Sequence, residues 1–254
     1  MLIDTHCHLY FDAFDADREA VIQRMHEAGV SSAVVVGIDP ATNELAHTLA
    51  AGYPELRYSV GLHPATELPA DIDVRDALLP WMSRQPRPLA IGECGIDLHW
   101  ETNPLQRQQE LFRQQLELAR DLGLPVIVHS RAADRETCDV LAAVDDVRCV
   151  LHCFNGSPLL LDLAIARAWY VSFAGNLTFQ KARELHEAAQ RLPLEQLLVE
   201  TDAPFLAPHP WRGRRCEPAY VVHTAHKLAE LRGLPVARMH EVLSANARYC
   251  FNPS

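Results

Sequence analysis

Short apolar runs alternate with helical patterns along the whole chain, and this alternation restricts the fold more than any other feature of the sequence. Each apolar run has the length of a β-strand, and the stretch between two runs is long enough for a helical crossover. The eight expected strands are Leu2–Leu9, Ala33–Ile38, Tyr58–His63, Leu89–Ile96, Pro125–Ser130, Cys149–Phe154, Trp169–Ala174 and Leu197–Asp202. The expected helices cover residues 17–28, 41–51, 74–83, 105–122, 133–143, 158–168, 179–191 and 219–232, with one more at 236–247. This order predicts an α/β protein with a parallel sheet.

Eight strand–helix units in a chain of 254 residues favour a closed (β/α)8 TIM barrel with an extra C-terminal helix. The alternative, an open doubly wound sheet, would need a glycine-rich phosphate turn after the first strand, and the sequence has none there. No Gly/Ser-rich or Pro-rich linker divides the chain, so we expect residues 1–254 to form a single domain.

Composition limits the possible partners and compartments. The formal net charge of −10 argues against a protein held on nucleic acid by a general positive field, so a phosphate substrate would need local cations. The seven cysteines contain no CxxC pair and indicate reduced thiols. The N-terminus does not have the pattern of a signal peptide, and no apolar run approaches membrane-spanning length. We therefore expect a cytoplasmic protein without membrane contact.

The first expected strand carries a pair of potential metal ligands, His6 and His8. Side chains two positions apart on a strand point to the same face, so both imidazoles can bind one ion. Enzymes with a barrel fold place their chemistry at the carboxyl ends of the strands. Metal-type residues occur late on four further expected strands: Glu93, His129, His152 and Asp202.

These six residues, His6, His8, Glu93, His129, His152 and Asp202, would ring one mouth of the barrel. Four histidines and two carboxylates exceed the needs of one catalytic ion, and a carboxylate can bridge two, so the set favours a two-metal centre with Glu93 as the bridge. Any one of them taken singly is more often a capped or supporting group than a ligand. It is their convergence that carries the prediction. Cys7, Cys94, Cys149 and Cys153 have the opposite strand parity and should point into the core, whereas Cys138, Cys216 and Cys250 stay undetermined.

Six motifs in this order resemble the TatD family of metal-dependent deoxyribonucleases, within the amidohydrolase superfamily, nearly from end to end of the chain. The motifs are Ile3-Asp4-Thr5-His6-Cys7-His8, Gly61-Leu62-His63-Pro64, Ile91-Gly92-Glu93-Cys94-Gly95-Ile96-Asp97, Pro125-Val126-Ile127-Val128-His129-Ser130-Arg131, Leu151-His152-Cys153-Phe154-Asn155-Gly156 and Val199-Glu200-Thr201-Asp202-Ala203-Pro204. The resemblance implies a distorted TIM barrel, divalent metals, phosphodiester hydrolysis and ligand roles for the six residues above. Two departures from the family pattern, Ala132 and Cys216, fall in loops expected to contact substrate and so bear on specificity.

Related members of the superfamily bridge their metals with a carbamylated lysine, but the only lysines here, Lys181 and Lys227, fall in expected helices. Glu93 must therefore serve as the bridge. We expect two divalent ions (Mg, Mn or Zn), with Asp202 and Glu93 as the catalytic residues; Asp202 would bind one ion and orient or deprotonate water. Glu200 could orient a metal ligand or make a structural hydrogen bond.

Local positive charge near the mouth would have to hold a polyanionic substrate. The candidates are His63, Arg131, Arg212, Arg214 and Arg215, although a solvated surface cluster is an equally good interpretation of the last three. Such a site suits single-stranded DNA ends, and the resemblance implies trimming from the 3′ end. The alternatives are a deacylase acting on D-aminoacyl-tRNA through the same metal centre, and a non-catalytic scaffold stabilised by its metals.

Overall fold

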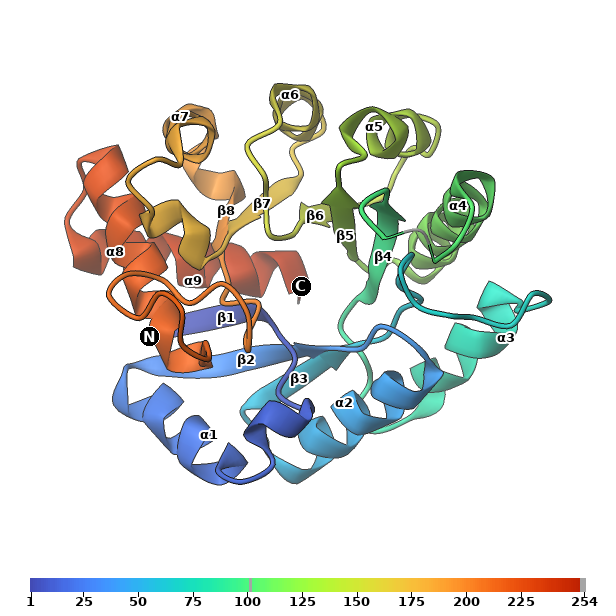
Figure 1. The fold of residues 1–254 in the computed structure, drawn as a ribbon, viewed down its shortest axis with the longest axis horizontal. Coiled ribbons are helices and arrows are strands. Elements are labelled where there is room, and N and C mark those ends of the chain that lie inside the picture. The colour runs from blue at the N-terminus through green and yellow to red at the C-terminus, as the bar shows by residue number, and fades with distance from the viewer. Residues whose placement is uncertain (101, 252–254) are drawn as a thin grey trace.

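The computed structural model describes residues 1–100 and 102–251 as parallel strands surrounded by helices (Figure 1). The strands are β1 (Leu2–Cys7), β2 (Val30–Val36), β3 (Leu56–Ser59), β4 (Ile91–Asp97), β5 (Val126–Arg131), β6 (Cys149–Leu151), β7 (Tyr170–Phe173) and β8 (Leu197–Val199). The α-helices are α1 (Arg18–Glu27), α2 (Pro40–Gly52), α3 (Val74–Leu78), α4 (Leu105–Leu122), α5 (Asp134–Ala142), α6 (Pro158–Ala166), α7 (Arg183–Arg191), α8 (Val221–Arg232) and α9 (Val236–Phe251). The alternation predicted from the sequence is confirmed.

The strands form two arcs that meet to close a distorted barrel. One arc has the order β1-β2-β3 and the other the order β4-β5-β6-β7-β8, and every pairing is parallel. A single parallel bridge joins the arcs on each side, Val60 with Ile91 and Cys7 with Ala203. At the second seam the His8 amide donates to the Ala203 carbonyl over 2.8 Å. The (β/α)8 barrel of the prediction is therefore present, with two short seams.

The barrel interior changes character along its axis. The inward side chains of several strands, such as Val34, Ile127 and Leu198, form an apolar cluster with Ala247 and Phe251 of α9. Helix α9 thus closes the amino-terminal end of the barrel, and it crosses close to β1 and β8 in Figure 1. Outward side chains pack in the larger cluster between strands and helices. The carboxyl-terminal end holds polar residues instead.

Several strands end earlier than the sequence predicts. β1 ends at Cys7, β3 at Ser59, β6 at Leu151 and β8 at Val199, so the potential ligands His8, His63, His152 and Asp202 follow the strands rather than lie on them. The helix expected over 74–83 ends at Leu78 and continues as a 3-10 turn whose second residue is Pro80. Proline has no amide hydrogen to extend an α-helix, which accounts for the change.

The parity argument for the cysteines holds within strands and fails beyond them. Cys7, Cys94 and Cys149 are buried in the core as predicted. Cys153 was expected there as well, and this prediction is wrong: it is partly exposed and lines the cavity at the barrel mouth. β6 has already ended, and the positive φ of 44° at Cys153 breaks the alternation. Of the undetermined cysteines, Cys216 and Cys250 are buried and Cys138 is partly so.

Among the helices of the described residues, none combines the length and the apolar character that a membrane crossing requires.

Candidate metal centre

The six side chains predicted to ring the barrel mouth come together at its carboxyl-terminal end. Five of them line a cavity of about 830 Å³: His8, Glu93, His129, His152 and Asp202. The sixth, His6, is fully buried, and its Nε2 atom lies 3.1 Å from Nε2 of His8. A large cavity, mostly apolar, into which a few imidazoles and carboxylates converge is the usual form of a catalytic site.

One group of potential ligands surrounds a space next to β1. Nε2 of His6 lies 3.4 Å from Oε2 of Glu93 and 3.6 Å from Oδ1 of Asp202. Nε2 of His8 lies 3.9 Å and 3.5 Å from the same two oxygens. Ligands about 2.1 Å from a tetrahedral zinc ion are separated from one another by about 3.4 Å. His6, His8 and Glu93 form one of the residue triples close enough to hold one ion, and Asp202 lies beside both histidines.

A second group collects around the other oxygen of Glu93. Oε1 of Glu93 lies 2.8 Å from Nδ1 of His129 and 2.8 Å from Nε2 of His152. Those two nitrogens are 3.3 Å apart, and Nε2 of His63 lies 3.4 Å from the same carboxylate oxygen. His63, Glu93 and His129 form one of the residue triples close enough to hold an ion. Glu93 thus directs one oxygen to each group, as a bridging carboxylate would.

The approach of β4 to β5 makes the second group possible. Gly95 is the Cα partner of His129 in this strand pair and has a φ of 152°. A Cβ atom at Gly95 would lie only 1.9 Å from the His129 carbonyl oxygen. Only glycine tolerates both the close contact and this φ angle, so Gly95 allows the strands that carry Glu93 and His129 to pack closely.

Further polar groups contact the second ring nitrogen of three of these histidines. Nε2 of His129 lies 3.0 Å from Oδ2 of Asp97, and Nδ1 of His152 lies 3.3 Å from Oε1 of Glu200. Nδ1 of His8 lies 3.0 Å from the Val36 carbonyl oxygen. A histidine whose second nitrogen is engaged in this way has a fixed ring orientation and tautomer, an arrangement common among metal-binding histidines.

Burial and mutual contact shift the pKa values of these groups. Burial raises the pKa of Glu93, but the neighbouring His152, His63 and His129 outweigh it and hold that pKa well below the usual range. Burial lowers the pKa of His152, but Glu93 and Glu200 outweigh it and raise that pKa well above the usual range. Burial and the neighbouring His152 lower the pKa of His6. The centre thus favours an ionised Glu93, and a carboxylate is a donor suited to divalent cations.

The donors therefore fit divalent metal ions on the geometry of this chain alone. Imidazole nitrogens lie 3.1 to 3.3 Å from one another in both groups, a crowding that a shared cation would relieve. The Nδ1 atom of His6 is buried without a hydrogen-bond partner, which is consistent with a ring oriented by its Nε2 contacts.

The predicted substrate contacts fall into two classes. His63 and Arg131 line the cavity. Arg212 lies over the ring of Phe179 and Arg214 over that of Trp211. Arg215 is engaged with Asp17 over 2.7 Å and with Glu217 over 2.8 Å. None of these last three arginines is among the described residues that line the cavity. Their substrate contacts stay predictions.

The sequence interpretation missed the role of Asp97, and a signal for it was present. Asp97 lies four residues after Glu93 and is the last residue of β4. Because side chains alternate along a strand, Asp97 and Glu93 are on the same face. Burial raises the pKa of Asp97, but the hydrogen bond with His129 outweighs it and lowers that pKa to about 2. The sequence left two roles open for Glu200, orienting a metal ligand or making a structural hydrogen bond. In the structure Glu200 contacts His152 and also accepts a hydrogen bond of 2.6 Å from the Cys153 amide.

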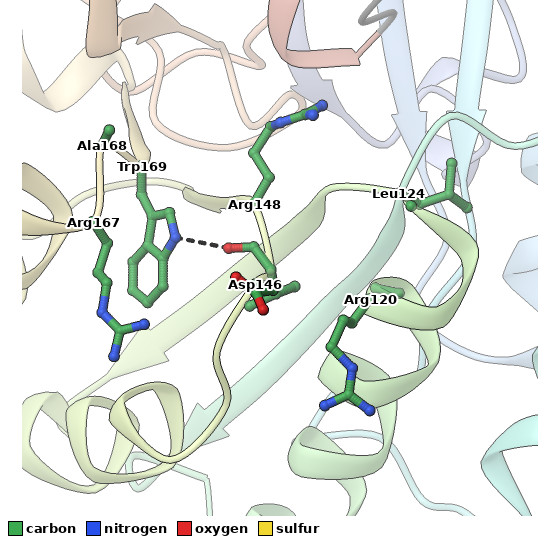
Figure 2. A pocket seen from close by; sticks show the side chains of 10 residues that line it. Arg120, Leu124, Asp146, Arg148, Arg167, Ala168 and Trp169 are labelled. Carbon is green, nitrogen blue, oxygen red and sulfur yellow. Dashed lines mark hydrogen bonds between the residues drawn. The ribbon is translucent and has the colours of Figure 1, made fainter.

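A second cavity, of about 390 Å³, lies at the opposite end of the barrel and has different walls (Figure 2). It is lined by residues that precede β5, β6 and β7, including Leu124, Arg148 and Trp169. Figure 2 shows Arg120 and Arg148 directed away from each other. The Trp169 indole donates a hydrogen bond of 2.8 Å to the Val147 carbonyl oxygen. It holds neither a histidine nor a cysteine among its lining residues, so it lacks the donors of the candidate metal centre.

Comparison with known proteins agrees with this geometry. A family model described as TatD related DNase matches residues 3–252. A Bacillus subtilis protein named uncharacterized metal-dependent hydrolase YabD is 36% identical, covering 99% of both chains. A protein of Erwinia tasmaniensis named 3′-5′ ssDNA/RNA exonuclease TatD is 33% identical over 99% of this chain and 100% of its own. The crystal structure of the TatD homologue YJJV from Escherichia coli K12 superposes with a TM-score of 0.92 at 32% identity, covering 100% of this chain and 98% of that one.

Proposed function

The chain belongs to the TatD family of metal-dependent hydrolases, and from this premise we propose that it is a two-metal phosphodiesterase that removes nucleotides from the 3′ end of single-stranded DNA. The observation that carries the proposal is the placement of Glu93 between two groups of ligands. One of its oxygens lies 3.4 Å from His6, and the other lies 2.8 Å from both His129 and His152. Two-metal centres of this kind are typical of phosphodiester hydrolysis.

Each site residue has a role in this proposal. His6, His8 and Asp202 would hold one divalent ion, His129 and His152 the other, and Glu93 both. The imidazoles suit Zn, and the carboxylates suit Mg and Mn. Bound ions would polarise a phosphoryl oxygen and lower the pKa of water. Asp202, at the cavity wall, would orient the attacking water and accept its proton. Glu200 and Asp97 would keep His152 and His129 in the required orientation.

The cavity residues His63 and Arg131 would position the phosphate of the substrate. His63 lies beside Glu93, and Arg131 adds a fixed positive charge to an otherwise acidic chain of net charge −10. A few local cations suit a strand end better than a duplex wrapped over a large surface. The exonuclease name of the relative from Erwinia tasmaniensis supports the same substrate class.

A time course with a 5′-labelled single-stranded oligonucleotide tests the proposal. We expect stepwise shortening from the 3′ end with Mn²⁺ or Mg²⁺ and none with a chelator, and metal analysis should find two ions per chain. Cleavage inside a circular single strand, or shortening from the 5′ end, would contradict it. A parallel assay on D-aminoacyl-tRNA distinguishes a deacylase, and inactivity on both substrates would leave a metal-stabilised scaffold.

A further inference from the structure

Two exposed aromatic rings line the cavity that holds the candidate metal centre. Phe205 is 52% exposed and Trp100 is 54% exposed, and both line this cavity, together with the partly buried Phe11. The third large exposed aromatic side chain of the described residues is Tyr249, on α9. An exposed ring does not contribute the stabilisation that burial in the core would give. Exposed rings that line one cavity therefore indicate a ligand-binding site.

Phe11 and Phe205 continue a chain of ring contacts that begins at His8 of the first group of ligands. The ring of Phe11 lies 5.4 Å from that of His8, and the ring of Phe205 lies 5.9 Å from that of Phe11 at an angle of 75°. The Phe205 amide donates to the Asp202 carbonyl over 2.8 Å. Phe205 is therefore held by the backbone of a proposed metal ligand.

Trp100 is attached to the second group in the same way. Oδ1 of Asp97 accepts a hydrogen bond of 3.1 Å from the Trp100 amide, and Oδ2 of Asp97 contacts His129. The guanidinium of Arg131 lies 5.8 Å from the centre of the Trp100 ring, within range of a cation–π contact. Trp100 thus combines a flat apolar face with a neighbouring positive charge.

We propose that Phe205 and Trp100 are stacking platforms for the bases of a single strand whose terminal phosphodiester lies at the metal centre. This inference rests on the proposed function and names what recognises the strand. Phosphates require cations and bases require flat apolar faces, and the cavity presents both: Arg131 and the proposed metals for the former, the two rings for the latter. Stacking on aromatic rings is tolerant of base identity, so the enzyme should trim strands with little sequence preference.

The test is a cycle in which bases and rings are removed separately. Phe205→Ala and Trp100→Ala should each raise KM about tenfold on an ordinary single-stranded oligonucleotide and change kcat less than about twofold. On an oligonucleotide whose 3′-terminal nucleotides are abasic, the same variants should match the unsubstituted enzyme. Trp100→Phe, which keeps a ring, should recover most of the affinity. Tyr249→Ala serves as the matched control, because it removes an exposed ring of α9.

A binding measurement separates this inference from the proposed function. Fluorescence anisotropy of a labelled single strand, with Glu93→Gln to prevent turnover, should show the same tenfold losses and the same indifference to abasic ends. Equal losses on ordinary and abasic strands, or no loss at all, would overturn the stacking role while leaving the nuclease proposal intact. Stacking-dependent binding without hydrolysis by the unsubstituted enzyme would support the platforms and overturn the nuclease. Absence of both binding and hydrolysis would overturn both.

Discussion

The two ends of the barrel are made by the same eight strands, yet they hold side chains of opposite character. The carboxyl-terminal end gathers imidazoles and carboxylates, with the two oxygens of Glu93 in contact with His6 on one side and His152 on the other. The amino-terminal end gathers apolar side chains, and Phe251 of α9 belongs to the same buried cluster as Val150 and Leu198. Arg148 donates a hydrogen bond of 2.8 Å to the Cys250 carbonyl and so ties α9 to the start of β6.

This difference separates stability from chemistry along the barrel axis. Apolar burial stabilises the fold in proportion to the area removed from water, whereas crowded ionisable groups add little net stability. Substitutions at the carboxyl-terminal end should therefore reduce activity in a folded protein. Substitutions at the amino-terminal end should reduce the free energy of unfolding and leave turnover intact.

The largest expected effect is at Glu93. Glu93→Ala should lower kcat/KM on the order of a thousandfold, since it removes the shared ligand of both proposed ions, while far-UV circular dichroism stays unchanged. Glu93→Gln, which keeps the shape and removes the charge, is the matched variant and should lose nearly as much. Retention of half of the original activity by either variant would disprove the bridging role.

The matching substitution at the other end is Phe251→Ala. Phe251 is 7% exposed, and its truncation should lower the free energy of unfolding by about 3 kcal/mol in a urea titration. kcat/KM should remain within twofold under folding conditions. Tyr249→Ala on the same helix, where the side chain is 66% exposed, should change stability by less than about 0.5 kcal/mol. A large loss of turnover in folded Phe251→Ala would show that the two ends are coupled.

An intermediate effect is expected at Asp97, whose carboxylate contacts Nε2 of His129. Asp97→Asn should weaken metal binding about 10- to 100-fold, because the neutral amide fixes the His129 tautomer less strongly. Titration calorimetry with Mn²⁺ or Zn²⁺ measures this loss independently of turnover. Metal affinity equal to that of the unsubstituted protein would limit Asp97 to anchoring the backbone of the Trp100 loop.

The smallest expected effect concerns the ion pairs of Arg215. Burial raises the pKa of Glu217, but Arg24 and Arg215 outweigh it and lower that pKa. A lowered carboxyl pKa contributes stability above its ordinary value near about pH 4, and this stability is lost as the pH falls through the lowered value. Arg215→Met should therefore cost no more than about 1 kcal/mol at pH 7 and less at pH 3, where Glu217 and Asp17, whose pKa values Arg215 lowers, are closer to being protonated. Thermal midpoints at both pH values check this, and a pH-independent loss would point to packing instead.

The sequence determined the order of the elements and the type of residue at each strand end, because hydrophobic periodicity and ligand chemistry are local properties. It therefore predicted the barrel, and it predicted that His6, Glu93 and His129 share its mouth. Parity gave the buried positions of Cys7 and Cys94 for the same reason, since both lie inside strands.

Only the tertiary structure decided what happens beyond the strand ends, where alternation no longer applies. Cys153 turns to the cavity, where its amide donates to Glu200, and Arg215 pairs with Asp17 near the other end of the chain. Each of these arrangements depends on contacts between segments far apart in the chain, and no local pattern specifies them. The division of the two Glu93 oxygens between two groups of histidines has the same origin, because it requires β4 and β5 to pack as closely as Gly95 permits.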